Sequence, residues 1–366
     1  MKLDDTLEKR YNCLAEEINF IRQKSIRGKK KNPRRDLNKP VSFWIKRERL
    51  LDEIGKEFTI ILKTRGCGWA LSESGGCSMC GYIEDAAIDD IDQKLIIEQF
   101  EYAVQQKLEE IQNDSHNYAI KLFNSGSFFD EAEISPNTRL KIYKNITLIP
   151  NIKEVTVESR IEFINRKILE EMLDFLKYNY IEIGIGLETA DDHIRNNYIN
   201  KGLLYDDFLD VYELCKNMGI GIKAYLLFKP PFMNEQAAID ECIYSIKKLI
   251  KIGVNTISIN PMNIQRGSLV ESLWHQKRYR PPWYYSLFKC LRKALNPKDL
   301  KKTRIVCDPS GAGTRRGIHN CLDYECNNNM KQKLEEFVLS QDLNALTIED
   351  HNCLCKTQYE LQRKYI

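Results

Sequence analysis

Three cysteines in the first third of the chain have the spacing of metal ligands. They lie in the segment KTRGCGWALSESGGCSMCGY (63–82), as Cys67-x9-Cys77-x2-Cys80. Three thiolates can hold three irons of a [4Fe–4S] cluster, which leaves the fourth iron open to the amine and carboxylate of a second ligand. A structural zinc site is the alternative, but it needs four ligands, usually in paired Cys-x-x-Cys motifs. We therefore predict that Cys67, Cys77 and Cys80 bind an iron–sulfur cluster.

A second group of potential metal ligands lies near the C-terminus. Cys321-x4-Cys326 together with Cys353-x-Cys355 can form a tetrahedral zinc site with four thiolate ligands. A second iron–sulfur cluster and a set of reduced, unliganded thiols are the alternatives. Two residues that can replace one of the four ligands are Cys307 and His319.

Twelve cysteines are many for a chain without a secretion signal. In a reducing compartment such cysteines are more often metal ligands than disulfides. Four of them stand alone in helix-like segments, and we interpret these as small core residues: Cys13, Cys215, Cys242 and Cys290.

The segments that must position these cysteines alternate between strand and helix patterns from Lys56 onward. Continuous apolar, β-branched runs predict strands at 57–63, 118–123, 152–159, 180–188, 221–228 and 254–260. Helical spacing predicts helices at 91–110, 165–177, 203–218 and 235–252, two of them ended by Gly219 and Gly253. Six strands that alternate with helices predict an α/β fold, a partial (β/α)6 barrel with its active site at the carboxyl ends of the strands. A doubly wound open sheet is the alternative.

The two ends of the chain differ in sequence pattern and composition from the predicted barrel at 56–270. Residues 1–55 have a helical pattern that is broken by the basic stretch Gly28–Pro40, where Pro33 and Pro40 disfavour helix. Residues 271–366 form a cysteine-rich C-terminal extension with a helix at 330–339. We expect three parts: an N-terminal helical arm, the barrel and this extension.

The charge of the chain is unevenly distributed. The net charge is +3, yet residues 22–39 contain nine Lys or Arg and one Asp, so the remainder is mildly acidic. A basic arm on an acidic body suggests an anionic partner such as nucleic acid, and a solvated tail is the alternative. The sequence has no apolar run of membrane-spanning length and no N-terminal signal, so we expect a cytoplasmic protein without a membrane partner.

The cysteine loop, which directly follows the first predicted strand, resembles that of the radical S-adenosylmethionine superfamily. The nine-residue gap is similar to the branch that contains the elongator catalytic subunit. The resemblance implies that a [4Fe–4S] cluster cleaves S-adenosylmethionine and starts radical chemistry. It also implies cofactor contacts at the ends of the next strands, by Asn124, Ser125, Gly126, Ser127, Glu158, Arg160 and Glu188.

The sequence from about residue 40 onward resembles one family more closely, the radical subunit of archaeosine synthase. The resemblance rests on the cysteine loop, the RPPW segment (280–283) and GAGTRRGIHNC (311–321). It implies that a partner subunit joins lysine to a 7-deazaguanine at tRNA position 15. The radical subunit, supplied with an electron by a donor, then cleaves the C–N bond of the lysine side chain to give archaeosine.

This resemblance suggests further contacts with the substrate. Glu188, Lys229 and Arg266 are candidates to hold the substrate lysine, with strand-end salt bridges as the alternative. The basic arm at 22–39 and the segment HQKRYRPPWYYS (275–286) are candidates to contact tRNA, with a packed loop as the alternative for the second. The competing functions are another radical S-adenosylmethionine enzyme and a zinc-stabilised RNA-binding protein.

Overall fold

The sheet of this protein contains eight strands in sequential order. The computed structural model describes residues 12–31, 36–348 and 353–365, so residues 1–11 of the predicted N-terminal arm lie outside the described ranges. Strand β1 pairs antiparallel with β2, and each later strand pairs parallel with the strand before it. The strands are β1 (Ser42–Arg49), β2 (Ile54–Leu62), β3 (Tyr118–Asn124), β4 (Ile152–Glu158), β5 (Tyr180–Glu188), β6 (Gly221–Phe228), β7 (Thr256–Pro261) and β8 (Arg304–Val306).

The sheet curls into an open half-barrel. Arg304 on β8 donates hydrogen bonds to Glu154 on β4 at 2.8 Å and to Glu182 on β5 at 3.0 Å. Strands that are not neighbours therefore meet across the concave face. The two edge strands β1 and β8 are not paired with one another, so the barrel stays open. The predicted partial α/β barrel is confirmed.

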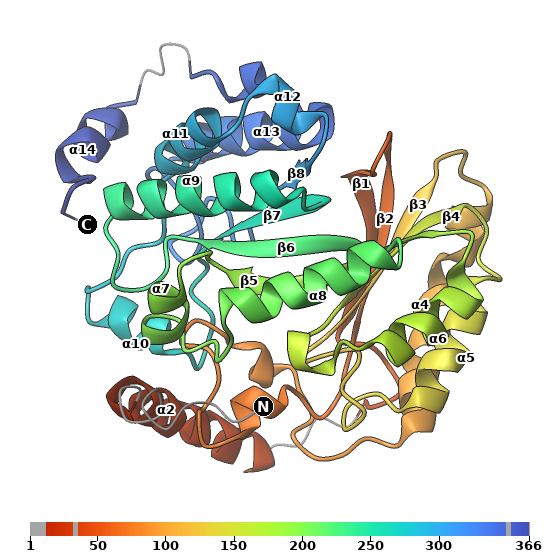
Figure 1. Cartoon of the computed structure of the whole chain (residues 1–366). Helices are drawn as coiled ribbons and strands as arrows, with labels where there is room; N and C mark the ends of the chain where they lie inside the picture. The colour runs from red at the N-terminus through yellow and green to blue at the C-terminus, as the bar shows by residue number, and fades with distance from the viewer. Residues whose placement is uncertain (1–11, 32–35, 349–352, 366) are drawn as a thin grey trace.

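Helices cover the convex face of the half-barrel (Figure 1). Apolar side chains of these helices and of the strands form one continuous core. Helix α9 shows how local sequence sets the boundaries: the side chain of Asn234 accepts a hydrogen bond from the Ala237 amide, and Gly253 ends the helix at φ 86°. The covering helices are α4 (Gln93–Gln112), α5 (Pro136–Ile146), α6 (Arg166–Leu176), α8 (Tyr205–Asn217) and α9 (Glu235–Ile252).

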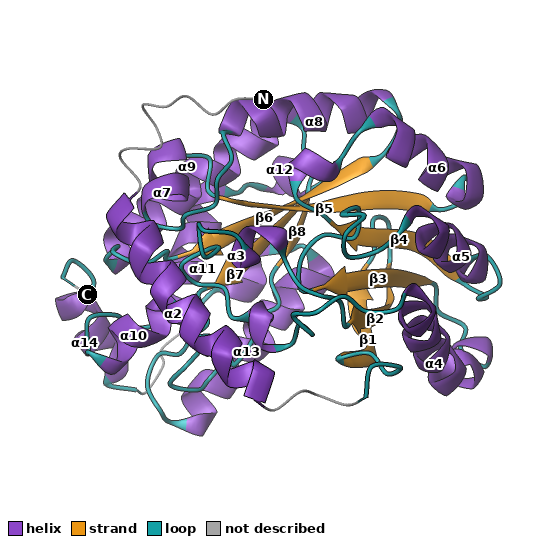
Figure 2. Ribbon diagram, turned by 90° about the horizontal axis from the view of Figure 1, so that it is seen from below, coloured by secondary structure: helices purple, strands orange, loops and turns teal. Residues whose placement is uncertain are grey.

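Shorter helices and the terminal segments complete the fold. Figure 2 views the molecule from below and shows α2 lying across the front, with α3 close behind it. Among the described residues, none of the helices combines the length and apolar character that a membrane span requires. These remaining helices are α2 (Asn12–Lys31), α3 (Gly68–Leu71), α7 (Asp192–Asn197), α10 (Leu269–His275), α11 (Tyr284–Ala294), α12 (Pro297–Leu300), α13 (Tyr324–Ser340) and α14 (Cys355–Gln362).

The sheet extends beyond the six predicted strands at both edges. Strand β1 lies in residues 1–55, for which the sequence predicted helix. The strand was not predicted because four of its eight residues are charged. Glu48 of β1 is buried, and it forms an ion pair at 2.9 Å with Lys121 of β3. Strand β8 is only three residues long and pairs with β7. The residues at 42–49 and 304–306 are therefore part of the sheet.

Candidate active site

The three cysteines of the 63–82 loop lie together at the carboxyl ends of the parallel strands. Cys77 is buried, and Cys67 and Cys80 are partly buried. Burial raises the pKa of all three thiols, and their mutual repulsion adds to the effect, with Cys77 acting on Cys67, Cys80 on Cys77 and Cys67 on Cys80. The structure therefore brings the three predicted cluster ligands to one place.

Three cations surround these thiols. Arg160 lowers the pKa of Cys67 and Cys77 against the effect of burial, and Lys201 lowers that of Cys77 and Cys80. Arg22 lowers the pKa of Cys80 in the same way. Positive charge around a thiolate group favours the deprotonated form, which is the form that binds a metal.

The loop after α7 holds the cysteine loop from one side. The side chain of Asn200 donates hydrogen bonds to the carbonyl oxygens of Ser74 and Gly76 at 3.0 and 2.8 Å. Its own carbonyl accepts one from the indole of Trp69 at 2.8 Å. Asn200 has φ 59°, a conformation that asparagine tolerates better than most residues. Sequence reasoning missed Asn200, which is distant in sequence from these partners.

Helix α2 holds the cysteine loop from the other side through Arg22. This guanidinium donates to the carbonyl oxygen of Gly75 at 2.9 Å and to that of Cys80 at 2.7 Å. Arg22 is only 1% exposed. Gly75 is needed at this contact, since a Cβ there would lie 2.6 Å from the backbone of Asn19. The first residue of the predicted basic arm is thus a buried part of the site and not an RNA contact, while 32–35 fall outside the described residues.

Replacement of Arg22 by methionine is expected to weaken retention of the iron–sulfur cluster by about 10–100-fold, as for other groups that support metal ligands. Methionine fills a similar volume but leaves the Gly75 and Cys80 carbonyl oxygens without their donor. The measurement is the rate of iron loss to a chelator under anaerobic conditions. Lys24→Met on the exposed face of α2 is the control and should match wild type. Equal rates for Arg22→Met and wild type would refute the role.

The predicted cofactor segment Asn124–Ser127 follows β3 and wraps around the carboxylate of Glu133. The side chain of Asn124 donates to Glu133 Oε2 at 2.7 Å, and the Ser127 amide donates to Oε1 at 2.8 Å. Thr64, at the start of the cysteine loop, donates to the same carboxylate at 2.5 Å. Glu133 is 1% exposed, and burial raises its pKa. Sequence reasoning missed Glu133, because nothing in its neighbourhood marks it as a residue that organises a binding loop.

The Asn124–Ser127 segment packs directly on Cys67. A Cβ on Gly126 would overlap Oε1 of Glu133 and would lie 2.7 Å from the Cα of Cys67. Only glycine fits there, so the segment and the first predicted cluster ligand are packed together.

Two predicted cofactor ligands, Arg160 and Glu188, lie on the same side of the cysteines. Arg160 is bonded to Glu162 and to the carbonyl oxygen of Lys201, and its guanidinium lies 5.2 Å from the ring centroid of Trp69. Glu188 forms a 2.9 Å ion pair with Lys201 and ends β5 at φ 67°. Lys201, another residue that sequence reasoning missed, therefore joins Glu188, Arg160 and the cysteines.

Charged side chains fill the concave face below the cysteines. Glu158 on β4 pairs in register with Gly184 on β5, and Gly184 pairs with Lys223 on β6. Burial raises the pKa of Glu158, opposed by a hydrogen bond with Tyr225. Burial lowers the pKa of Lys223 to about 8, and the positive charge of Lys121 adds to this shift. Among the described residues Lys223 forms no ion pair, and its ammonium lies 5.2 Å from the ring centroid of Tyr225.

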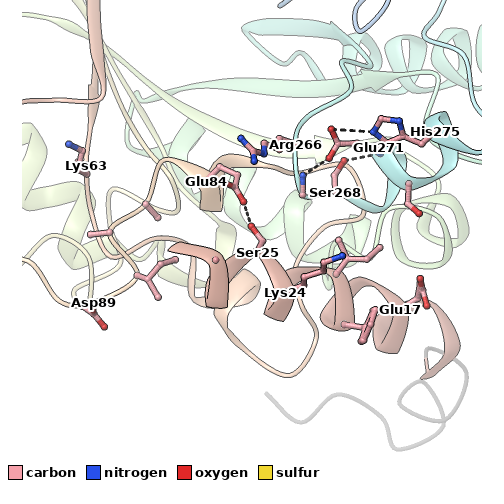
Figure 3. A pocket seen from close by; sticks show the side chains of 18 of the residues that line it. Glu17, Lys24, Ser25, Lys63, Glu84, Asp89, Arg266, Ser268, Glu271 and His275 are labelled. Atoms are coloured by element: carbon pink, nitrogen blue, oxygen red, sulfur yellow. Dashed lines mark hydrogen bonds and ion pairs between the residues drawn. The ribbon is translucent and has the colours of Figure 1, made fainter. Parts of the chain in front are cut away.

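Of the candidates for holding a substrate lysine, Lys229 is a structural residue. It is 1% exposed, and its ammonium donates to Glu235 at 2.7 Å and to the carbonyl oxygen of Arg280 at 2.9 Å. Arg266 instead is exposed and lies on the wall of a cavity of about 1210 Å³. Figure 3 shows this cavity between α2 and the segment with Ser268, Glu271 and His275. The wall of this cavity adjoins the cysteine loop, since a Cβ on Gly81 would lie 2.6 Å from the carbonyl oxygen of Arg266.

The segment 275–286 divides into a short exposed part and a longer packed part. Residues 275–278, including Lys277 and Arg278, are exposed. From Tyr279 the segment packs into the protein, and the guanidinium of Arg280 lies 3.7 Å from the ring centroid of Trp283. Within this segment only residues 275–278 are therefore open to a contact with tRNA.

The four C-terminal cysteines that were predicted to bind zinc lie together in a separate group. Their sulfur atoms all lie within 4.8 Å of one another, so the group can hold a metal ion. The two substitute ligands are not members of this group: Cys307 is buried after β8, and His319 Nδ1 bonds the carbonyl oxygen of Gly317 at 2.7 Å. The four are Cys321, Cys326, Cys353 and Cys355.

Known proteins similar to this chain include three archaeal relatives of nearly full length. An uncharacterised protein of Methanocaldococcus jannaschii is 41% identical over 92% of this chain and 90% of its own. Archaeosine synthase subunit beta of Methanosarcina acetivorans is 37% identical over 90% of both chains. The same subunit of Thermococcus kodakarensis is 34% identical over 87% of this chain and 95% of its own. No family model matches the sequence.

Two solved structures are more distant. Queuine lyase from Clostridium spiroforme has a TM-score of 0.45 at 21% identity and covers 72% of this chain and 94% of its own. The Methanocaldococcus infernus Elp3 with an N-terminal deletion has a TM-score of 0.47 at 13% identity and covers 66% and 59%. Likenesses at this level do not by themselves define a fold or a function.

A three-thiolate loop at the carboxyl ends of a parallel half-barrel is the arrangement of a radical S-adenosylmethionine enzyme, and this protein is one. With 34–37% identity over about nine tenths of its length, the protein belongs to the archaeosine synthase subunit beta family. The predicted family is confirmed, and the predicted cofactors, a [4Fe–4S] cluster and S-adenosylmethionine, follow with it.

The residues present fit these cofactors. The three thiols and their surrounding cations suit an anionic cluster with one open iron. The side-chain oxygen of Asn124 is buried and accepts no hydrogen bond from the described residues, so it can accept one from the amine of S-adenosylmethionine. Gly126 keeps the backbone beside Cys67 free of a side chain. The individual cofactor contacts from Asn124 to Glu188 stay predictions.

Proposed function

We propose that this protein completes archaeosine in tRNA by cleaving a C–N bond in the side chain of a lysine attached to the 7-deazaguanosine at position 15. The proposal is supported by family membership and by the three-thiolate loop. When bound, the cluster and S-adenosylmethionine supply a 5′-deoxyadenosyl radical, which can remove hydrogen from the lysine carbon beside the nitrogen. The protein's own residues must hold the substrate and exclude water.

The observation that carries this substrate is the ammonium of Lys223 inside the half-barrel, which forms no direct ion pair among the described residues. Three carboxylates attract it from a longer distance, those of Glu48, Glu158 and Glu182. A buried lysine without a directly bonded carboxylate costs stability, and such costs are commonly retained where a ligand needs the charge. The carboxylate of a substrate lysine has the charge to pair with it. We assign Lys223 to this carboxylate, while Glu188 and its partner Lys201 stay near the cysteines.

The tRNA body approaches from the exposed basic residues. Arg266 on the cavity wall and Lys277 and Arg278 beyond α10 are exposed and can contact phosphates. The modified base must leave the folded tRNA to reach the half-barrel, as bases do in other enzymes that act on them. The partner is the subunit that attaches lysine, an electron donor reduces the cluster, and we place the reaction in the cytoplasm.

The buried charge of Lys223 predicts an unusual dependence of stability on pH. Between about pH 8 and the ordinary lysine value of 10.5 the unfolded chain binds this proton and the folded chain does not, so stability rises with pH in that window. Lys223→Met is expected to raise the free energy of unfolding at pH 7 by roughly 1–3 kcal/mol. The gain should shrink toward pH 10. Urea unfolding of cluster-free protein at both pH values, with the exposed Lys141→Met as control, measures this; a gain that does not depend on pH would contradict it.

The same variant tests the substrate. Wild type should act on tRNA carrying the lysine adduct with a kcat/KM at least about tenfold above that for an adduct made with the decarboxylated amine, since one charged partner is lost. Lys223→Met should lose most of this discrimination and retain turnover of the decarboxylated adduct. Equal discrimination by both enzymes would remove Lys223 from the proposal, and inactivity of wild type on both adducts would reject lysine C–N cleavage.

A further inference from the structure

The C-terminal cysteines lie at the distances of a mononuclear metal site. The sulfur atoms of Cys321 and Cys353 are 3.8 Å apart, and so are those of Cys326 and Cys355. In a regular tetrahedron with Zn–S bonds of about 2.3 Å the sulfurs are about 3.8 Å apart. A disulfide would need about 2.05 Å. The separations therefore match the edges of a tetrathiolate site.

A cluster with several irons does not fit the same group. In an iron–sulfur cluster the cysteines bind different irons, which spreads their sulfurs beyond the separation set by one ion. All four sulfurs here lie within 4.8 Å of one another. A single tetrahedral ion with four sulfur ligands indicates zinc, with mononuclear iron as the chemical alternative.

Hydrogen bonds preset the backbone around two of these cysteines. The side chain of Asn327 in α13 donates to the carbonyl oxygen of Cys321 at 2.7 Å and accepts from the Asn320 amide at 3.0 Å. Asp323 caps α13 by accepting from the Cys326 amide at 2.8 Å. The segment between the first two ligands is thus held in place by its own side chains, as a metal-binding turn requires.

Of the other two cysteines, Cys355 begins helix α14 and Cys353 lies two residues before it, and this helix is too short to be stable alone. Helix α14 has eight residues, and isolated helices of this length are marginal in water. Its end docks on the start of α9, where the Gln236 amide donates to the carbonyl oxygen of Arg363 at 3.1 Å. A metal bridge from Cys353 and Cys355 to the start of α13 would fasten the other end.

The group of four C-terminal cysteines is also connected to the end of β6. Arg280 donates to the carbonyl oxygens of His319 and Asn320, the two residues before Cys321, at 3.0 and 2.8 Å. The carbonyl oxygen of Arg280 in turn accepts from Lys229 at the carboxyl end of β6. Fixing Cys321 therefore fixes a segment that reaches the rim of the half-barrel.

We propose that Cys321, Cys326, Cys353 and Cys355 bind one structural zinc ion that joins α13 and α14 and anchors the 311–321 loop to the half-barrel. The site is separate from the iron–sulfur site in both ligands and geometry. It closes the C-terminal extension on the barrel, where the buried residues of α14 are limited to Cys355 and Tyr359.

Metal analysis of the full-length protein tests the proposal. Wild type, purified under anaerobic conditions without added iron, should contain one zinc per protein molecule by mass spectrometry. A Cys67→Ser/Cys77→Ser/Cys80→Ser variant should keep that zinc and lose the capacity to bind a cluster. Cys321→Ser/Cys353→Ser should lose the zinc, and Cys215→Ser in α8 should keep it.

X-ray absorption at the zinc edge of wild type tests the same ligands without relying on variants, which can lose zinc because they fail to fold. It should show four sulfur ligands at about 2.3 Å. The proposal would be overturned if wild type contained no zinc or contained iron in its place. It would also be overturned if the Cys67→Ser/Cys77→Ser/Cys80→Ser variant lost the zinc, or if the ion had ligands other than four sulfurs.

Discussion

Replacement of Cys77 by alanine is expected to abolish cluster binding and reduce 5′-deoxyadenosine formation to background. Cys77 is buried beside Cys80 and Cys67 and faces both Lys201 and Arg160. Two remaining thiolates cannot hold three irons, and alanine offers no ligand in their place. Iron and sulfide content, cluster absorbance and 5′-deoxyadenosine after dithionite reduction measure the effect.

The matched control for this prediction is Cys215→Ala. Cys215 is also a buried cysteine, but it lies in α8 and burial alone raises its pKa. We expect this variant to keep its cluster and its turnover, at a cost of about 1 kcal/mol in stability. A Cys77→Ala protein that binds a full cluster and cleaves S-adenosylmethionine would refute the assignment of the loop.

Gly126→Ala should have the second largest effect, by damaging cofactor binding without touching a ligand. The added methyl would overlap Glu133 Oε1 and lie 2.7 Å from the Cα of Cys67. Neither neighbour can withdraw freely, because Glu133 is held by Thr64, Asn124 and Ser127. Overpacking of this kind costs about 1–3 kcal/mol. We expect the Kd for S-adenosylmethionine to rise by about 10–100-fold, as when other residues that support a site are changed.

Equilibrium dialysis with cluster-loaded protein measures that Kd, and urea unfolding measures the stability. Gly28→Ala in α2 is the control, since no heavy atom lies within 4 Å of the added methyl. Alanine in a helix should stabilise the protein by about 0.5–1 kcal/mol and leave the Kd unchanged. An unchanged Kd in Gly126→Ala would show that the Asn124–Ser127 segment does not contribute to cofactor binding.

The sequence was sufficient to predict the central six strands because their apolar runs are continuous and buried on both faces. Strand β1 was not predicted, because its run of charged residues at 46–49 resembles a solvated helix. The ion pair of Glu48 with Lys121 on β3 explains why such a run can lie in a sheet. That pairing joins residues 73 positions apart and leaves no local pattern.

The same distinction separates what could be predicted of the site from what could not. The three cysteines are close in sequence, so their spacing alone indicates a common centre. Arg22, Asn200 and Lys201 reach the loop from elements before and after it, and their contacts depend on how the half-barrel folds. Arg22 had the appearance of an RNA contact because its neighbours are basic, whereas its burial under the loop is a tertiary property.

The most direct test is an anaerobic reaction of the reconstituted, dithionite-reduced protein with S-adenosylmethionine and tRNA bearing the lysine adduct. We predict that wild type forms both 5′-deoxyadenosine and archaeosine, each quantified by mass spectrometry. 5′-Deoxyadenosine without archaeosine would reject the proposed substrate and leave the radical chemistry in place. Neither product, from protein shown to carry an intact cluster, would contradict the assignment of this protein as a radical enzyme.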